Sequence, residues 1–236
     1  MNKINGLHHI AIATADMKGQ IAFFTDVLGM ELVALYWMHG VENTWHGFLR
    51  LNDESAIAFV QSPDIKDIPV TIGQSHAGNP GGPCAAGAMQ HLAFRVADET
   101  ELMAMKDRIR SRGVPVMGPI DHGFCKSIYF AGPEHLTLEL SYSTEAIDAE
   151  AWIDPEVQAL AGISPEELAA FKAPPSYQDA GGTLPQPPLS ASGPHMSGYA
   201  EGAYEKVIAL PDAVVLAKLS ETKPPVKRPA VGDEAL

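Results

Sequence analysis

Residues 7–16 (LHHIAIATAD) and residues 89–98 (MQHLAFRVAD) follow one pattern. Each stretch has a histidine at its third position, an apolar middle and a final aspartate. An apolar run bounded by polar residues is typical of a strand, and an Asp before a periodic segment is a common helix N-cap. We therefore expect each stretch to form a strand that runs into a helix, with His9 and His91 at equivalent positions.

The segments that follow the two stretches also repeat one order, a helix and then three strands. Apolar residues at helical spacing predict the helices, and short runs rich in β-branched and aromatic residues predict the strands. The first helix and strands are expected over residues 17–30, 31–38, 44–51 and 55–61, and the second set over residues 99–112, 114–117, 124–131 and 135–142. The fold class is thus α+β, with tandem βαβββ modules at residues 6–61 and 88–142.

Composition changes twice along the chain and suggests its domain boundaries. Residues 62–87 are rich in Gly, Pro and Ala and predict a long loop, either a functional lid or a flexible connector. We expect a metal-binding domain over residues 1–143. A Pro-rich, partly helical C-terminal extension is expected over residues 144–236, with short helices at 150–160 and 164–172. Its apolar residues predict that the extension docks and helps to build a homo-oligomer.

The bulk composition excludes several classes of partner. The chain has 236 residues and a formal net charge of −13, without a basic run interleaved with aromatics, which argues against nucleic acid and against an anionic membrane. No stretch reaches the roughly 18 apolar residues of a membrane span. Two cysteines, Cys84 and Cys125, do not make a disulfide framework. These features predict a cytoplasmic protein.

Glu139 closes the second module as His91 opens it. A glutamate between two leucines on an apolar strand is costly to bury without a partner. His9, His91 and Glu139 together make a 2-His-1-carboxylate set, which favours Fe(II), with Mn(II) as the alternative. His8 is expected to hold a neighbouring ligand in position rather than to bind the metal itself.

A βαβββ unit used twice, with metal ligands on its first and last strands, resembles the vicinal oxygen chelate superfamily. That superfamily includes glyoxalases, fosfomycin-resistance enzymes, bleomycin-binding proteins and type I extradiol dioxygenases. The resemblance covers residues 6–142 and implies an incompletely closed, eight-stranded barrel. Because this fold supports many chemistries, it leaves the activity open.

Residues 122–139 (HGFCKSIYFAGPEHLTLE) resemble the extradiol dioxygenase signature. The resemblance implies that Tyr129 and His122 orient and protonate substrate oxygens. Gly132 and His135 depart from the usual residues of the turn. The tandem His8-His9 also resembles the hydroquinone-cleaving branch of these dioxygenases, in which the second histidine is the ligand.

Glyoxalases of this superfamily have a fourth ligand on the last strand of the first module, at the position equivalent to Glu139. An offset of 80 residues between the modules places Phe59 at that position. A phenylalanine cannot bind metal, so the resemblance implies three ligands and open positions for substrate and O2. Phe48, Ile57 and Phe59 are expected to line the cavity. The base histidine of catechol-cleaving relatives is replaced by Glu54-Ser55, which leaves His46, or else His76, as the candidate for proton transfer.

The leading hypothesis is an extradiol-type ring-cleaving dioxygenase that acts on a dihydroxylated aromatic compound with O2 and a non-haem divalent metal. The first alternative is a metal-dependent isomerase, lyase or hydrolase of the same superfamily. The second is a small-molecule-binding protein without catalysis.

Overall fold

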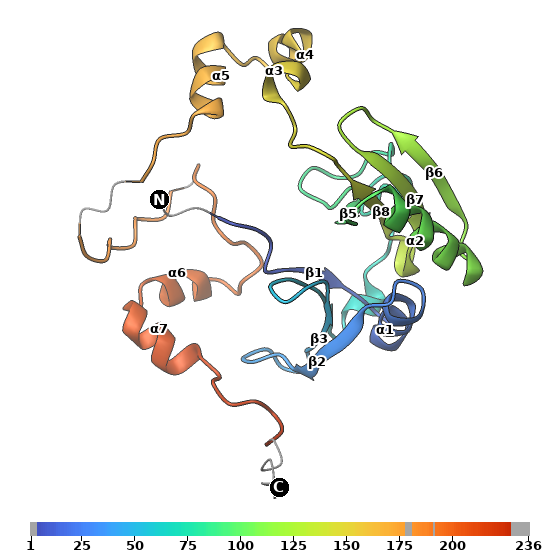
Figure 1. Ribbon diagram of the computed structural model, residues 1–236. Coiled ribbons are helices and arrows are strands. Elements are labelled where there is room, and N and C mark those ends of the chain that lie inside the picture. The colour runs from blue at the N-terminus through green and yellow to red at the C-terminus, as the bar shows by residue number, and fades with distance from the viewer. Residues whose placement is uncertain (1–3, 178–180, 191, 228–236) are drawn as a thin grey trace, which may run out of the picture. The chain divides into compact units, whose positions relative to one another are not determined.

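The computed structural model describes residues 4–177, 181–190 and 192–227. The chain divides into two compact units (Figure 1). Of the described residues, 4–37 and 43–175 belong to one unit, and 38–42, 176–177, 181–190 and 192–227 belong to the other.

The first module forms one four-stranded sheet with a helix. In the sheet order β1-β4-β3-β2, the β1–β4 pair is parallel and the others are antiparallel. The elements are β1 (His9–Ala13), α1 (Met17–Asp26), β2 (Glu31–Trp37), β3 (Trp45–Arg50) and β4 (Ala56–Gln61).

The second module repeats this arrangement as β5-β8-β7-β6, with a parallel β5–β8 pair. Its elements are β5 (Leu92–Arg95), α2 (Glu99–Ser111), β6 (Val116–Asp121), β7 (Lys126–Ala131), the 3-10 turn η2 (Pro133–His135) and β8 (Thr137–Tyr142). The α+β class, the tandem modules and their two separate, unclosed sheets confirm the predicted fold (Figure 1).

Both helices begin where the sequence predicts, because a polar cap marks the same position in both modules. The helix α2 ends within one residue of the expected bound, whereas α1 ends at Asp26, ahead of the expected residue 30. Asp16 accepts a hydrogen bond from Gly19 N at 2.9 Å, and Asp98 accepts one from Glu101 N at 2.9 Å. After the helices, Gly29 and Gly113 both have a φ of +79°, a left-handed conformation in which glycine carries no steric penalty.

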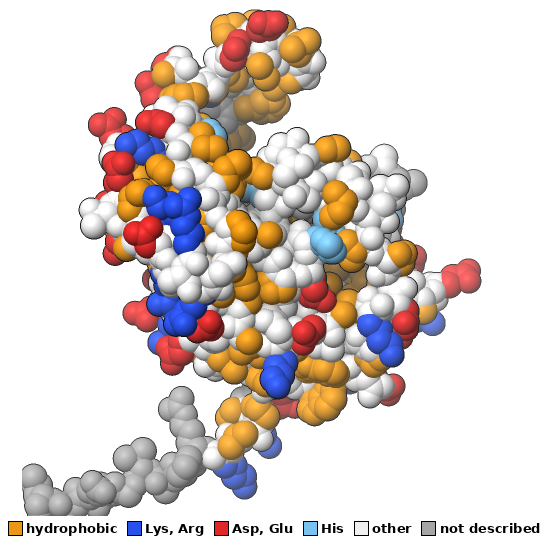
Figure 2. Space-filling view, turned by 90° about the vertical axis from the view of Figure 1, so that its right-hand side faces the viewer, with side chains coloured by type: hydrophobic (Ala, Val, Ile, Leu, Met, Phe, Trp, Pro, Cys, Tyr) orange, Lys and Arg blue, Asp and Glu red, His pale blue; other side chains and the backbone are white. Residues whose placement is uncertain are grey.

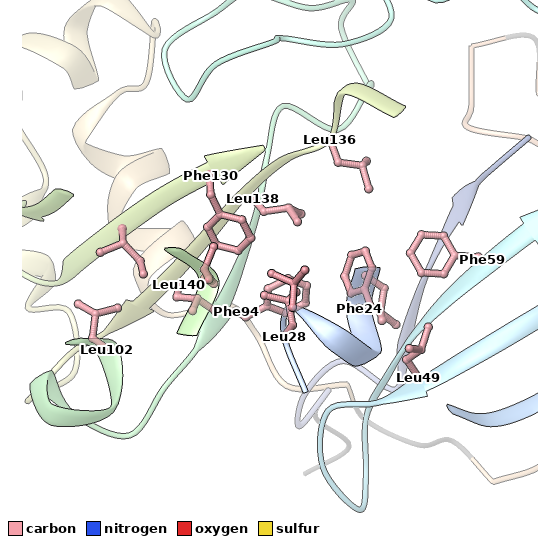
Figure 3. Close-up of a cluster of buried hydrophobic side chains, with 14 of the residues drawn as sticks. Phe24, Leu28, Leu49, Phe59, Phe94, Leu102, Phe130, Leu136, Leu138 and Leu140 are labelled. Carbon is pink, nitrogen blue, oxygen red and sulfur yellow. The ribbon is translucent and has the colours of Figure 1, made fainter. Parts of the chain in front are cut away.

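The hydrophobic core is shared by the two modules. Phe24 of α1 makes edge contacts with Phe59 of β4 and with Phe94 of β5, at ring-centroid distances of 5.1 and 6.3 Å (Figure 3). Leu102 of α2 and Leu138 of β8 belong to the same cluster and are fully buried. The modules therefore bury their apolar faces together.

A glutamate of the second module holds the first turn of α1. Glu134 accepts hydrogen bonds from the Thr14 hydroxyl at 2.5 Å, from Ala15 N at 2.8 Å and from Gln20 Nε2 at 2.8 Å. Glu134 and the next residue, His135, have left-handed backbones, with φ of 52° and 64°. The turn between β7 and β8 is thus bent so that a carboxylate reaches the N-terminus of a helix in the other module.

An arginine of the second module holds the opposite end of α1. Arg108 of α2 donates from Nε to Val27 O at 2.8 Å and from Nη2 to Asp26 O at 2.9 Å. Arg112 adds an ion pair with the Asp26 carboxylate at 3.3 Å. Positive side chains thereby meet the carbonyl groups that the end of a helix leaves unpaired.

The rest of the chain carries short helices. Residues 150–160, expected as one helix, form α3 (Ala149–Trp152) and α4 (Pro155–Leu160). Proline in a helix interior loses a hydrogen bond and clashes with the preceding turn, so Pro155 starts a new helix, capped by Asp154. The remaining helices are α5 (Pro165–Lys172), α6 (Ala203–Ile208) and α7 (Asp212–Leu219).

Within the described part of the chain, none of the helices has the length and apolar character that crossing a bilayer requires. The division at residue 143 and the cytoplasmic location stay predictions.

Glu134→Gln should lower the free energy of unfolding by about 1–3 kcal/mol, because an amide offers one acceptor oxygen in place of a charged carboxylate to three donors. Urea denaturation measures this change. Asp53 holds the equivalent position in the turn of the first module and is exposed, so Asp53→Asn is the control and should change stability little. Equal effects of the two substitutions would contradict the role given to Glu134.

Candidate metal centre

His91 and Glu139 converge in the second module. His91 directly precedes β5, and Glu139 lies in β8 opposite Ala93. Their Nε2 and Oε2 atoms are 3.0 Å apart. Only 5% of Glu139 is exposed, and a buried carboxylate requires a cation or hydrogen-bond donors. Imidazole nitrogen and carboxylate oxygen are also ligands of divalent metals, so this pair fits two positions of a metal site.

The strand registers place His9 and His91 at equivalent positions. His9 lies opposite Ala56 at the start of the parallel β1–β4 pair. In the second module Leu92 lies opposite Leu138, so His91 falls one position earlier, at the level of Thr137. The expected equivalence of the two histidines therefore agrees with the pairing of the strands.

The structure does not group His9 with the other two expected ligands. The His9 ring instead contacts Phe48 at 5.5 Å, and its Nδ1 lies 2.8 Å from Nδ1 of His8. Among the residues that the structure describes, no three His, Cys, Asp or Glu side chains are arranged to hold a metal ion. The three-ligand set stays a prediction, of which the geometry brings two members together.

Tyr129 and His122 lie beside the His91–Glu139 pair. Tyr129 of β7 is directly opposite Glu139 on β8, and its ring centroid is 6.4 Å from that of His91. Its hydroxyl shares a hydrogen bond of 2.9 Å with His122 Nε2. Burial raises the pKa of the Tyr129 hydroxyl, and the Glu139 carboxylate raises it further, so the hydroxyl keeps its proton. Four residues that the sequence singled out thus lie together.

His46 and Phe48 belong to an aromatic face of the first module. Phe48 stacks on Tyr36 of β2 at 6.1 Å and contacts the His46 ring at 5.5 Å. Burial lowers the pKa of His46, and the neighbouring His9 lowers it further. Within the described residues, His46 Nε2 is buried without a hydrogen-bond partner. The structure therefore groups His46 with His9 rather than with Tyr129.

The expected place of Phe59 and Ile57 in the cavity is corrected by the strand register. Tyr129 and Glu139 are opposite each other in the second module, as Phe48 and Ala58 are in the first. Ala58, rather than Phe59, is thus the equivalent of Glu139. Phe59 and Ile57 point to the other face of the sheet, where both are fully buried in the core (Figure 3). A register error of one residue moves a side chain to the opposite face.

The sequence analysis missed Gln90, whose side-chain oxygen touches His91 Nδ1. Its position next to a candidate ligand was the signal that could have revealed it.

A cavity of about 350 Å3 lies next to this site. Its lining comprises Ile72, Gly78, Asn79, Pro80, Met117, Tyr129, Phe130, Ala131, His135, Leu136 and Thr137. On the face in Figure 2, acidic and basic side chains are interspersed and histidines reach the surface.

A family model described as the glyoxalase/bleomycin resistance protein/dioxygenase superfamily matches residues 6–140. The comparison with curated proteins gives no significant match.

Solved structures with similar folds include a glyoxylase/bleomycin resistance protein/dioxygenase domain from Frankia sp. EAN1pec, with 14% identity and a TM-score of 0.46 over 60% of this chain and 99% of that one. A lactoylglutathione lyase from Agrobacterium tumefaciens has 18% identity and a TM-score of 0.43 over 64% and 98% of the two chains. The fosfomycin resistance protein FosX from Listeria monocytogenes has 21% identity and a TM-score of 0.41 over 60% and 96%.

Phe59→Ala should destabilise the fold by about 3–5 kcal/mol, because it leaves a cavity beside Phe24 in the core. Chemical denaturation measures the loss. Phe48→Ala is the matched comparison and should cost less, since Phe48 is only half-buried. If Phe59→Ala left stability unchanged, the assignment of Phe59 to the core would be wrong.

Proposed function

The chain belongs to the glyoxalase/bleomycin resistance protein/dioxygenase superfamily, and we propose that it is a metal-dependent, extradiol-type dioxygenase that cleaves the ring of a dihydroxylated aromatic compound. The observation that carries the proposal is the hydrogen-bonded Tyr129–His122 pair beside His91 and Glu139. It supplies a proton donor and acceptor next to two metal ligands.

His91 and Glu139 would hold Fe(II), or Mn(II), and His9 is proposed as the third ligand. When bound, the metal would supply Lewis acidity toward the substrate hydroxyls and a path for electron density from the ring to O2. Both oxygen atoms enter the ring-opened product, so the reaction needs no outside reductant.

The residues of the first module favour a metal site with three protein ligands rather than four. Ala58 stands where the second module has Glu139, and a methyl group cannot bind metal. Open positions remain for a substrate with two adjacent oxygens and for O2. Ala58, like Phe59 in the earlier expectation, leaves three protein ligands.

The side chains around the pair have separate tasks. The Tyr129 hydroxyl, which holds its proton, would donate a hydrogen bond to a substrate oxygen. His122, bonded to that hydroxyl, would take up or return the proton as the ring opens. His46 is proposed as a proton carrier from the side of the first module, and His8 as support for His9.

The alternative is an isomerase, lyase or hydrolase in which the metal acts only as a Lewis acid. It would use the same His91–Glu139 pair, and it predicts metal-dependent turnover without oxygen consumption.

The chain is also proposed to form a homo-oligomer, which light scattering of the full chain would test. Edge strand β2 supports this, because Leu35 and Trp37 expose apolar side chains there.

Protein purified without oxygen should carry about one Fe or Mn per chain, and Glu139→Ala should weaken metal binding by about 100-fold or more. Loss of a supporting residue alone costs about 10–100-fold in metal affinity. Titration with Mn(II), followed by electron paramagnetic resonance, measures the affinity. Glu145→Ala removes an exposed carboxylate and is the control. Equal affinities in the parent and in Glu139→Ala would show that Glu139 is not a ligand.

Tyr129→Phe should lower kcat for ring cleavage by about 100-fold while metal affinity stays the same, because general acid–base groups contribute about 100- to 10000-fold. Oxygen uptake is measured against catechols, hydroquinones and bicyclic diols. Tyr142→Phe removes a hydroxyl that bonds Glu99 and should retain activity. Metal-dependent turnover of another substrate class without oxygen uptake would favour the alternative.

A further inference from the structure

The side chain of Gln90 joins the loop before the second module to the imidazole of His91. Its Nε2 lies within hydrogen-bond distance of three backbone carbonyls, 3.3 Å from Asn79 O, 2.9 Å from Pro80 O and 3.1 Å from Gly82 O, which share its two protons. Carbonyl oxygens only accept hydrogen bonds, so the amide nitrogen must face the loop. The orientation of the Gln90 amide is therefore fixed by chemistry.

This orientation fixes the proton of His91 as well. The Gln90 oxygen faces His91 Nδ1, and an oxygen acceptor there requires a proton on Nδ1. In the neutral ring, Nε2 then presents a lone pair to Glu139 Oε2 at 3.0 Å. Two lone pairs at this distance repel each other unless a cation binds both or the ring takes a second proton. The His91 tautomer is thus the one that a metal ligand needs.

Two of the three residues whose carbonyls Gln90 contacts belong to the wall of the cavity of about 350 Å3. Asn79 and Pro80 line it together with Ile72, and Tyr129 and Thr137 line it from the second sheet. Tyr129 also neighbours Glu139 in the strand pair. One side chain therefore touches both the wall of the cavity and the histidine beside it.

We propose that Gln90 is a positioning residue that sets the tautomer of His91 and couples this ligand to Asn79 and Pro80 in the cavity wall. The metal part of the proposal rests on the proposed function. Movement of the wall when a substrate enters would be transmitted through Gln90 to the imidazole, so that substrate binding and ligand geometry are linked.

Two substitutions separate the contacts of Gln90. Gln90→Glu keeps an oxygen acceptor for His91 Nδ1 but removes the donor to the loop. Gln90→Leu removes both. Gln74→Leu changes an exposed glutamine of the same loop and is the control.

Hydrogen exchange and 15N NMR of the histidine ring are measured on the metal-free protein, with circular dichroism to confirm folding. Exchange in residues 79–88 should become faster in both Gln90 variants. His91 should keep its Nδ1 proton in Gln90→Glu and lose its preference for Nδ1 in Gln90→Leu, where the Glu139 carboxylate favours a proton on Nε2. Mn(II) affinity should change little in Gln90→Glu and fall by about 10–100-fold in Gln90→Leu. The Gln74→Leu variant should match the parent throughout.

Unchanged loop exchange in both Gln90 variants, or an unchanged His91 tautomer in Gln90→Leu, would overturn the proposal. Equal loss of metal affinity in Gln90→Glu and Gln90→Leu would also overturn it, because that result assigns Gln90 a purely structural role. A parent protein that binds no metal contradicts the proposed function instead. The tautomer and the exchange rates still decide the role of Gln90, since neither requires metal.

Discussion

Side chains of the second module form hydrogen bonds at both ends of α1, and the rest of the structure depends on this constraint. Glu134 meets the first turn of the helix, and Arg108 meets its last carbonyls. The negative side chain lies at the positive end of the helix dipole and the positive one at the negative end, so the charges add to the hydrogen bonds. The proposed site, which would draw His9 from one module and Glu139 from the other, relies on this joint, because each sheet by itself pairs only with its own strands.

The two modules have the same order of strands but carry different side chains at equivalent positions. At equivalent positions the first module has Phe48 and Ala58, and the second has Tyr129 and Glu139. The first therefore presents an aromatic ring and a methyl group, and the second presents oxygen atoms, which are proposed to bind metal and to carry a proton. The opening histidine is the proposed ligand that the two modules have in common. A duplicated fold can thus offer an apolar wall and a polar centre without changing its strand order.

Local patterns predicted most of the fold, and long-range contacts account for what they missed. Alternating and helical periodicities gave the strands and helices, since these depend on residues close in sequence. The repeat gave the equivalence of His9 and His91. The pairing of β3 with β4, compared with that of β7 with β8, was needed to identify Ala58, because an offset wrong by one residue had placed Phe59 on the opposite face. The contacts of Glu134 lie 114–120 residues away and leave no local pattern.

The strand order also governs the sequence in which the chain can fold. Each sheet consists of strands from one continuous segment, and neither borrows a strand from the other. Pairing within a segment closes shorter loops than pairing between segments, so both sheets can form before the modules meet. Until they meet, Phe24 and Phe94 lack their contact with each other. A newly made first module thus exposes apolar surface that only the second half of the chain can cover, which gives the protein a period of vulnerability to aggregation during its synthesis.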